Sequence, residues 1–153
     1  MAEFKLISNN KKARHDYFIE DTYEAGLELF GTEVKSIRDG KASIKEAYAE
    51  IRNGEMFIIG MNITPYDHGN QFNKDPLRTR RLLLHKREII KMEDLKTRDG
   101  YTLVPLRLYI NPRGLVKIEI AVAKGKKNYD KRETLAKKDA ERKIQKALKD
   151  YNR

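Results

Sequence analysis

The residues with the clearest chemical potential are four clusters of basic side chains, whose shared chemistry is the binding of phosphate. They are Lys11, Lys12, Arg14 and His15; Lys35 and Arg38; Arg78, Arg80, Arg81, His85, Lys86 and Arg87; and the segment from Lys124 to Arg153. Guanidinium groups bind phosphate at two points, and ammonium groups act as point charges. One such cluster is typical of a solvated surface. Several of them on one small protein favour RNA or DNA as a partner.

The last cluster holds most of the excess charge. From Lys124 onward, 12 Lys and Arg stand against 5 Asp and Glu, so this segment carries +7 of the formal +10. Its apolar residues recur every three to five positions, which predicts one thin helical stripe. Asp130 and Glu133 have the spacing of a capping box, and Gly125 would supply a flexible joint before them. Because so thin a stripe is marginal in water, we predict a tail that is disordered alone and helical when bound. The alternative is a disordered, solubilising extension.

Acidic and histidine side chains offer little beyond binding. Glu24 differs from the other carboxylates, because on a basic face it would accept hydrogen bonds from base amino groups or position a neighbouring Arg. An ordinary surface carboxylate is the alternative. His15, His68 and His85 show no metal-ligand spacing, and Gly40-Lys41 lacks the flanking residues of a phosphate-binding loop. The sequence therefore predicts no enzyme activity, no cofactor and no metal.

Composition bounds the class of protein. A chain of 153 residues with 39% apolar content fits one domain plus an appendage. A charged fraction of 37% and a pI near 9.7 indicate an anionic partner, nucleic acid first and a membrane surface second. No apolar run approaches the roughly 20 residues of a spanning helix, and the amino terminus resembles no export signal, so we expect a cytoplasmic protein without membrane contact. The absence of Cys excludes disulfides and thiol chemistry.

Short strands must position these clusters. We expect a basic arm over residues 8–16, a first strand from Tyr17, and a second strand with alternating apolar residues from Tyr23 to Leu29. A helix follows over residues 31–40, with Thr32 as its N-cap and Gly40 as its stop.

Two hairpins dominate the rest of the body: residues 44–52 with 56–63, and 101–110 with 115–122. Asn53-Gly54 favours a type I′ turn in the first, and Asn111-Pro-Arg-Gly114 favours a type I turn in the second. Between the hairpins we predict a loop over 64–76, a short buried segment over 82–84 and a helix over 86–98. Ile89 and Ile90 should face inward from that helix, and Gly100 should close it.

About six short strands without helical crossovers predict a mainly β fold. We expect a small closed antiparallel barrel of the oligonucleotide-binding (OB) type, with two or three short helices and a basic carboxyl-terminal tail. The body would span residues 1–123 and the tail residues 124–153.

Six segments, in order along the chain, carry a resemblance to a known family. They are Asn10-Lys-Lys-Ala-Arg-His-Asp-Tyr17, Glu24-Ala-Gly-Leu27, Gly31-Thr-Glu-Val-Lys-Ser-Ile-Arg38, Asn62-Ile-Thr-Pro65, Asp75-Pro-Leu-Arg-Thr-Arg-Arg-Leu-Leu-Leu84 and Val122-Ala-Lys-Gly-Lys-Lys-Asn-Tyr-Asp-Lys-Arg132. They closely resemble the tmRNA-binding SmpB (SsrA-binding) protein family over nearly the whole chain. This chain departs from the family in its short amino-terminal extension and in Tyr129, at a position where other members have His. Tyr can still stack on a base, but it lacks the titratable cation of His near neutral pH.

The resemblance implies a bacterial ribosome-rescue factor of trans-translation. Its expected partners are the tRNA-like domain of tmRNA, elongation factor Tu in the delivery complex, and the decoding region and 16S rRNA of the 70S ribosome, with a monomer as the free state. The implied tmRNA-binding residues are Asn10, Lys11, Lys12, Arg14, His15, Glu24, Lys35, Arg38, Arg78, Arg80, Arg81, Leu83 and Lys117. The implied ribosome-binding tail residues are Lys124, Gly125, Lys126, Lys127, Tyr129, Asp130, Lys131, Arg132, Lys137, Lys138, Arg142 and Lys143, with Tyr129 stacking on a decoding-centre base.

Two other functions remain open on the residues alone. A generic single-strand-binding module would use stacking aromatics along its strands and bind any unstructured oligonucleotide. A nuclease would depend on His15 or His68.

Overall fold

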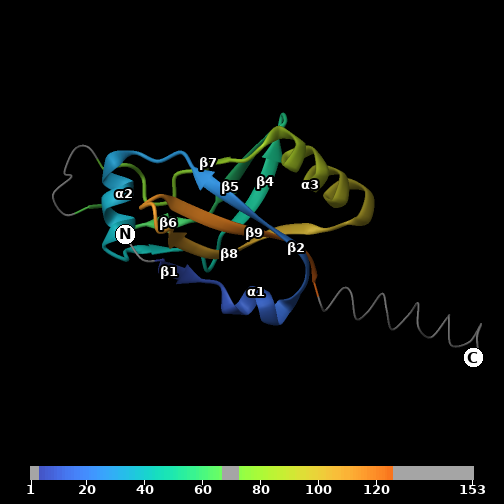
Figure 1. Cartoon of the computed structure of the whole chain (residues 1–153), viewed down its shortest axis with the longest axis horizontal. Helices are drawn as coiled ribbons and strands as arrows, with labels where there is room; N and C mark the ends of the chain where they lie inside the picture. Colours follow the sequence, from blue (N-terminus) through green and yellow to red (C-terminus); the bar gives the residue numbers. More distant parts are fainter. Residues whose placement is uncertain (1–3, 67–72, 126–153) are drawn as a thin grey trace, which may run out of the picture.

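The computed structural model describes residues 4–66 and 73–125, and this part of the chain is mainly β with three helices (Figure 1). In chain order the elements are β1 Lys5–Asn9, α1 Lys11–Asp16, β2 Tyr17–Leu27, α2 Gly31–Arg38, β3 Ala42–Ser43, β4 Tyr48–Arg52, β5 Glu55–Ile59, β6 Asn62–Ile63, β7 Arg80–Leu83, α3 Lys86–Asp99, β8 Thr102–Ile110 and β9 Val116–Gly125. The mainly β class and the small number of helices confirm that part of the prediction.

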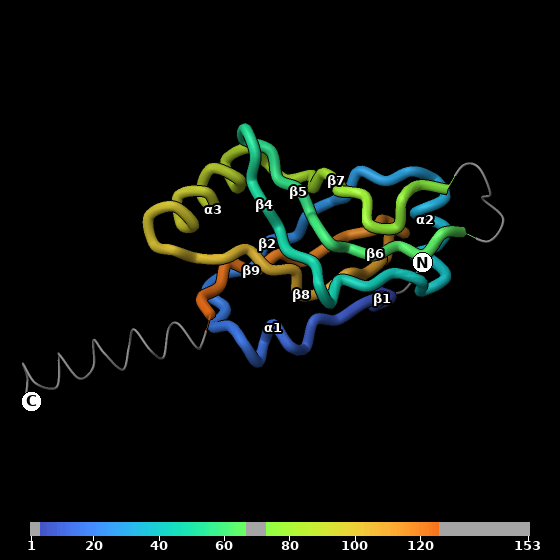
Figure 2. The backbone as a smooth tube through the Cα atoms, turned by 180° about the vertical axis from the view of Figure 1, so that it is seen from behind, coloured from blue at the N-terminus to red at the C-terminus, as the bar shows by residue number. Residues whose placement is uncertain are grey.

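Seven strands form one antiparallel sheet in the order β1-β8-β9-β2-β7-β5-β4, and β3 pairs with β6 separately. The large sheet curls until β4 lies against β8 (Figure 2). Its edge strands β1 and β4 share no hydrogen-bonded ladder among the described residues. The prediction of a closed barrel is therefore wrong, because closure requires a match between the two sheet edges that local strand patterns do not encode.

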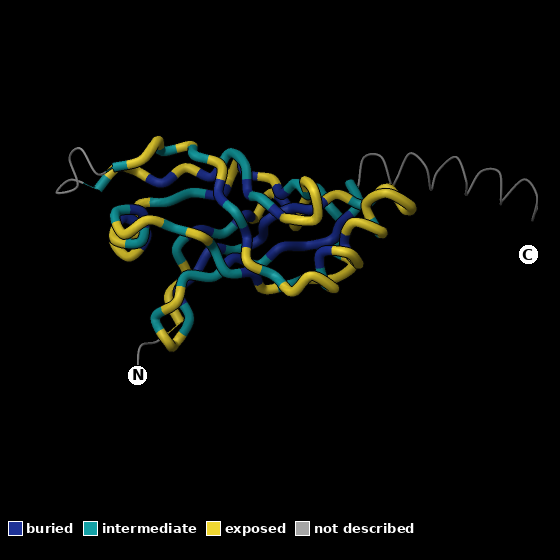
Figure 3. Tube along the Cα trace, turned by 90° about the horizontal axis from the view of Figure 1, so that it is seen from above, coloured by how far each residue is buried: buried dark blue, intermediate teal, exposed yellow. Residues whose placement is uncertain are grey.

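The core lies on the concave side of the curled sheet. On β9, Ile118, Ile120 and Val122 are fully buried, while Lys117 and Glu119, which alternate with them in the sequence, lie on the other face. Figure 3 shows the buried residues running along the strands and the exposed residues on the helices and turns. Each large apolar side chain buried in this way stabilises the fold by about 1.5–3 kcal/mol.

The amino-terminal third differs from the prediction in two ways. The expected basic arm is the end of β1 followed by the helix α1, and the two expected strands are the single long strand β2, with a bulge between Ile19 and Asp21. The helix packs through Ala13 onto a small apolar cluster that includes Leu106 and Ala121. This tertiary contact explains a helix that the polar sequence of residues 8–16 does not reveal by itself.

The two longer helices lie where they were predicted, and the N-cap of α2 differs from the prediction. Phe30 rather than Thr32 is the N-cap of α2, and its N–H donates to Glu33 Oε1 at 2.9 Å. Gly100 ends α3 in the left-handed conformation, as predicted. Ile89 faces the core but Ile90 is 54% exposed, so the expectation of an inward Ile90 is wrong.

Both hairpin turns follow their sequences, and one nearby glycine allows a stability test. Asn53 and Gly54 have positive φ angles, as a type I′ turn requires. Gly60 also has a φ of +81°, but a Cβ there would lie 2.7 Å from the carbonyl oxygen of Glu46, whereas nothing lies within 4 Å of a Cβ at Gly54. We expect Gly54→Ala to cost about 1–2 kcal/mol of left-handed strain and Gly60→Ala clearly more. Thermal unfolding of both variants checks this, and equal losses would contradict the clash.

Candidate nucleic-acid interface

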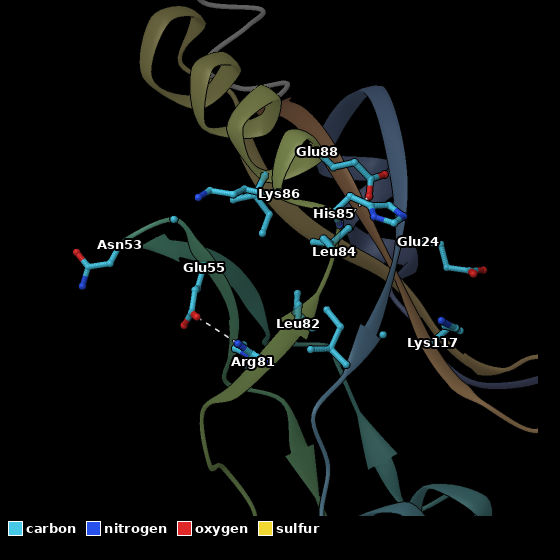
Figure 4. A pocket seen from close by; sticks show the side chains of 14 residues that line it. Glu24, Asn53, Glu55, Arg81, Leu82, Leu84, His85, Lys86, Glu88 and Lys117 are labelled. Carbon is cyan, nitrogen blue, oxygen red and sulfur yellow. Dashed lines mark hydrogen bonds and ion pairs between the residues drawn. The ribbon is translucent and has the colours of Figure 1, made fainter.

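An open groove of about 790 Å³ lies between β2, β7, the turn from β4 to β5 and the start of α3 (Figure 4). Its lining is Glu24, Gly26, Asn53, Gly54, Glu55, Arg81, Leu82, Leu83, Leu84, His85, Lys86, Glu88, Ile89 and Lys117. This lining combines an apolar floor with charged walls. Such a mixture suits a ligand that has both flat apolar faces and charged groups.

Four predicted RNA-binding residues line this groove: Arg81, and three others that converge from three strands. Glu24 comes from β2, Leu83 from β7 and Lys117 from β9. Gly26 pairs with both Leu83 and Lys117 in the sheet. A Cβ at Gly26 would lie 3.4 Å from Leu83 Cβ and 3.8 Å from Lys117 Nζ, so glycine keeps the floor open between them. Leu83 itself is 45% exposed, which corrects the expectation of a wholly buried segment over 82–84.

Arg81 forms part of the groove wall and belongs to two surface ion pairs. Its guanidinium lies 3.1 Å from a carboxylate oxygen of Glu28 and 3.1 Å from one of Glu55. Exposed ion pairs of this kind contribute little to stability. Arg81 is therefore accessible to a phosphate that replaces either carboxylate.

The α1 cluster divides into one structural residue and several exposed cations. The Asn10 side chain accepts from Ala13 N–H at 3.1 Å and donates to the Pro105 carbonyl at 3.0 Å, so it caps α1 and ties the helix to β8. Asn10 is buried, while Lys11, Lys12, Arg14 and His15 are exposed. Arg14 reaches Glu119 at 3.6 Å.

Arg78 and Arg80, two members of the third predicted cluster, form an internal cluster with Glu33. The other members lie elsewhere, because Arg81, His85 and Lys86 line the groove and Arg87 is exposed. Arg80 is fully buried, and its guanidinium donates to Glu33 Oε2 at 2.7 Å and to the Met61 and Pro76 carbonyls. Arg78 donates to Glu33 Oε1 at 2.6 Å. This arrangement leaves Arg80 no access to phosphate, which argues against the direct RNA contact expected of it. Arg80 instead joins β7 to α2.

The charge balance of this internal cluster follows from its contacts. Burial raises the pKa of Glu33, but hydrogen bonds from Arg78, the Phe30 N–H and Arg80 outweigh burial, and the pKa lies below its ordinary value of 4.5. Lys35 and Arg38 are exposed on α2 and do not line the groove. The predicted RNA-binding residues therefore occupy four places and not one surface: the groove, α1, the internal cluster and α2.

The strands add polar residues that sequence reasoning missed. On the outer face of β8 and β9, Arg107 holds Glu119 through two hydrogen bonds of 3.1 and 3.3 Å. The hydroxyl of Tyr109 on β8 donates to Glu24. Burial, then the hydrogen bond to Glu24 and its charge, raises the pKa of Tyr109 far above its usual range. In the sequence, Arg107 and Tyr109 alternate with Leu106 and Leu108. This alternation is the signal that could have placed Arg107 and Tyr109 on the outer face.

The start of the predicted tail belongs to the sheet. Lys124 pairs with Phe18 and Gly125 with Tyr17, so β9 runs two residues beyond the expected boundary. The other predicted tail positions lie outside the described residues, as does His68; these positions are Lys126, Lys127, Tyr129, Asp130, Lys131, Arg132, Lys137, Lys138, Arg142 and Lys143.

Features of other functional classes are scarce in the described ranges. Residues 4–66 and 73–125 contain no group of three or more His, Asp or Glu that could hold a metal ion. The His15 side chain is 89% exposed and lies 3.1 Å from its neighbour Asp16. No helix within these ranges has the length and apolar character needed to cross a membrane.

Comparisons with known proteins agree with one another. The model of the SmpB protein family matches residues 7–150. An SsrA-binding protein of Clostridium tetani is 60% identical over 149 residues, which cover 97% of this chain and 95% of that protein. An SsrA-binding protein of Clostridium botulinum is 60% identical over 147 residues, which cover 96% of this chain and 94% of that protein.

One solved structure is also similar. A chain of the structure described as "tmRNA-SmpB: a journey to the center of the bacterial ribosome" superposes with a TM-score of 0.64 and 46% identity, over 77% of this chain and 82% of that chain. Because the family model covers most of the sequence and the relatives match nearly end to end, this chain belongs to the SmpB protein family.

Proposed function

We propose that this protein binds the tRNA-like domain of tmRNA and brings it to stalled ribosomes during trans-translation. The observation that carries the proposal is the meeting of Glu24, Leu83 and Lys117, from three strands, in one groove. The names of its relatives, which are SsrA-binding proteins, and the tmRNA-SmpB ribosome structure support it. RNA with a folded shape is recognised by backbone contacts and by bases or edges that the fold exposes.

In this proposal the groove and the α1 cations act together. Lys117, Arg81 and the exposed cations Lys11, Lys12 and Arg14 contact phosphates, and Leu83 provides an apolar surface for a base or ribose. The curled sheet is an OB-type platform on which this RNA binds. Elongation factor Tu joins in delivery, and the free protein is a cytoplasmic monomer.

The basic tail has the second role in the proposal. Its cations would follow ribosomal phosphate along the decoding centre and the empty message channel, where the tail becomes helical after being disordered in the free protein. Tyr129 would stack on a decoding-centre base, and six cations would contact phosphate: Lys131, Arg132, Lys137, Lys138, Arg142 and Lys143. The charge of +7 from Lys124 onward supports this assignment.

Competition binding tests the proposed function. At about 0.15 M salt, a transcript of the tRNA-like domain should bind about 1,000-fold or more tightly than a single strand of equal length, since specific sites typically exceed non-specific ones by at least that factor. Equal affinities would favour the single-strand-binding module. Cleavage of either RNA by the purified protein, lost in His15→Ala, would favour the nuclease.

Lys117→Met tests the groove directly. Removing one phosphate contact should weaken binding of the tRNA-like domain and reduce the slope of log affinity against log salt by about 0.7–0.9. Lys45→Met is the matched control, because Lys45 is exposed and does not line the groove. A salt titration of both variants gives the slopes. The same slope for wild type and Lys117→Met would remove Lys117 from the interface.

A further inference from the structure

One carboxylate at the groove is held by a tyrosine from two strands away. Glu24 on β2 and Tyr109 on β8 lie on either side of β9, and the Tyr109 hydroxyl donates to Glu24 Oε2. Tyr109 is only 5% exposed, whereas Glu24 is exposed. In the part of the chain that the structure describes, no hydrogen bond reaches the other oxygen, Glu24 Oε1.

The tyrosine ring is itself fixed. Phe4 packs on it with ring centroids 4.8 Å apart, and the Arg107 guanidinium lies 5.3 Å from its centroid. Arg107 in turn is held by its two hydrogen bonds to Glu119. A tyrosine hydroxyl is protonated at physiological pH, and the upward shift of the Tyr109 pKa goes in the same direction, so Tyr109 is a donor. A rigid donor thus points at a side chain that would otherwise rotate freely.

The charge of Glu24 indicates what that side chain does. A carboxylate in an interface that binds phosphate opposes binding unless it accepts hydrogen bonds from the ligand. Exocyclic base amino groups are such donors, and carboxylates accept from them in nucleic-acid complexes. To accept a hydrogen bond from a base without facing the phosphates, the Glu24 carboxylate must be held in one orientation.

We propose that Tyr109 is a positioning residue for RNA recognition, which holds Glu24 Oε2 so that Glu24 Oε1 accepts a hydrogen bond from an exocyclic base amino group of RNA at the groove. This inference rests on the proposed function, and it adds a residue that does not itself touch RNA. Phe4 and Arg107 contact the Tyr109 ring and help to hold it in place.

The test is a double-mutant cycle on full-length protein with the tRNA-like domain transcript. Tyr109→Phe keeps the ring and removes the donor, and we expect about two- to tenfold weaker binding, the cost of ordering one free side chain. In a Glu24→Ala background the same change should cost nothing further. Tyr23→Phe is the matched control, because the Tyr23 hydroxyl is buried with no hydrogen-bond partner among the described residues, and it should leave affinity unchanged.

Several outcomes would overturn the inference. Wild-type affinity in Tyr109→Phe, or an equal loss in the Glu24→Ala background, would show that Tyr109 does not act through Glu24. If Tyr109→Phe fails to fold, Glu24→Asp, whose shorter side chain withdraws the carboxylate from the hydroxyl, must show the loss. A wild type without preference for the tRNA-like domain would instead refute the proposed function.

Modified RNA identifies the donor. Base analogues that lack the exocyclic amino group should weaken binding to wild type at one position and have no effect there on Glu24→Ala. A 2′-deoxy substitution could instead weaken binding to wild type and leave binding to Glu24→Ala unchanged. In that case a ribose hydroxyl is the donor, and the assignment to a base amino group is wrong.

Discussion

A chain that ends at Gly125 is expected to bind the tRNA-like domain of tmRNA with nearly full affinity and to lose all tagging of stalled ribosomes. The structure supplies the cut site, because β9 remains paired with β2 through Gly125. The shortened chain lacks 11 of the 12 cations from Lys124 onward and keeps every groove residue named above. Affinity at about 0.15 M salt should change little, since exposed charges beyond about 8 Å from the RNA are screened there.

The measurements are a binding titration and a reconstituted tagging assay on ribosomes stalled without downstream message. Tyr129→Ala in the full chain is the control, because it keeps the cations and removes only the proposed stacking group, worth about 1–3 kcal/mol. It should lower tagging without touching RNA affinity. A tenfold or greater loss of RNA affinity on truncation would contradict the separation of the two roles, and full tagging by the short chain would refute the role of the tail.

Glu33→Ala is expected to destabilise the fold by about 3–5 kcal/mol, because it leaves buried Arg80 without its charged partner. The carboxylate accepts from Arg78 and Arg80 and also from the Phe30 N–H, so one substitution loosens β7 and the start of α2 together. Chemical denaturation gives the free energy. Glu50→Ala is the control, since its pair with Arg52 lies at the surface, and it should leave the unfolding midpoint nearly unchanged. Equal midpoints for the two variants would show that the internal cluster contributes no more than a surface pair.

The same carboxylate predicts a pH dependence. The pKa of Glu33 is lower in the folded protein than its ordinary value of 4.5. Its stabilising contribution is therefore complete above pH 4.5 and is lost as the pH falls through the lower, folded value. Unfolding midpoints measured from pH 6 to pH 3 should fall less steeply for Glu33→Gln than for wild type. Parallel curves would assign the acid sensitivity to other groups.

Much of the fold was predictable because its signals are local. The Asn53-Gly54 turn, the hairpin of β8 and β9 and the end of α3 at Gly100 each depend on a few adjacent residues with defined backbone preferences. The alternation on β9 also placed Lys117 on the outer face and Ile118 in the core. The convergence of Glu24, Leu83 and Lys117 was foreseen only as a family resemblance, since their spacing in the chain suggests nothing.

The remaining features of the fold depend on which strands become neighbours in the sheet. The sequence shows Arg78, Arg80 and Arg81 as three equivalent cations, but pairing of β7 beside β2 and β5 buries one against Glu33 and leaves another at the groove wall. The short helix α1, the open sheet edge and the contact of Tyr109 with Glu24 arise in the same way. The local elements and the excess charge after Lys124 could be predicted from short stretches of sequence. Burial and pairing of charges depend on contacts across dozens of residues, and no local pattern specifies those contacts.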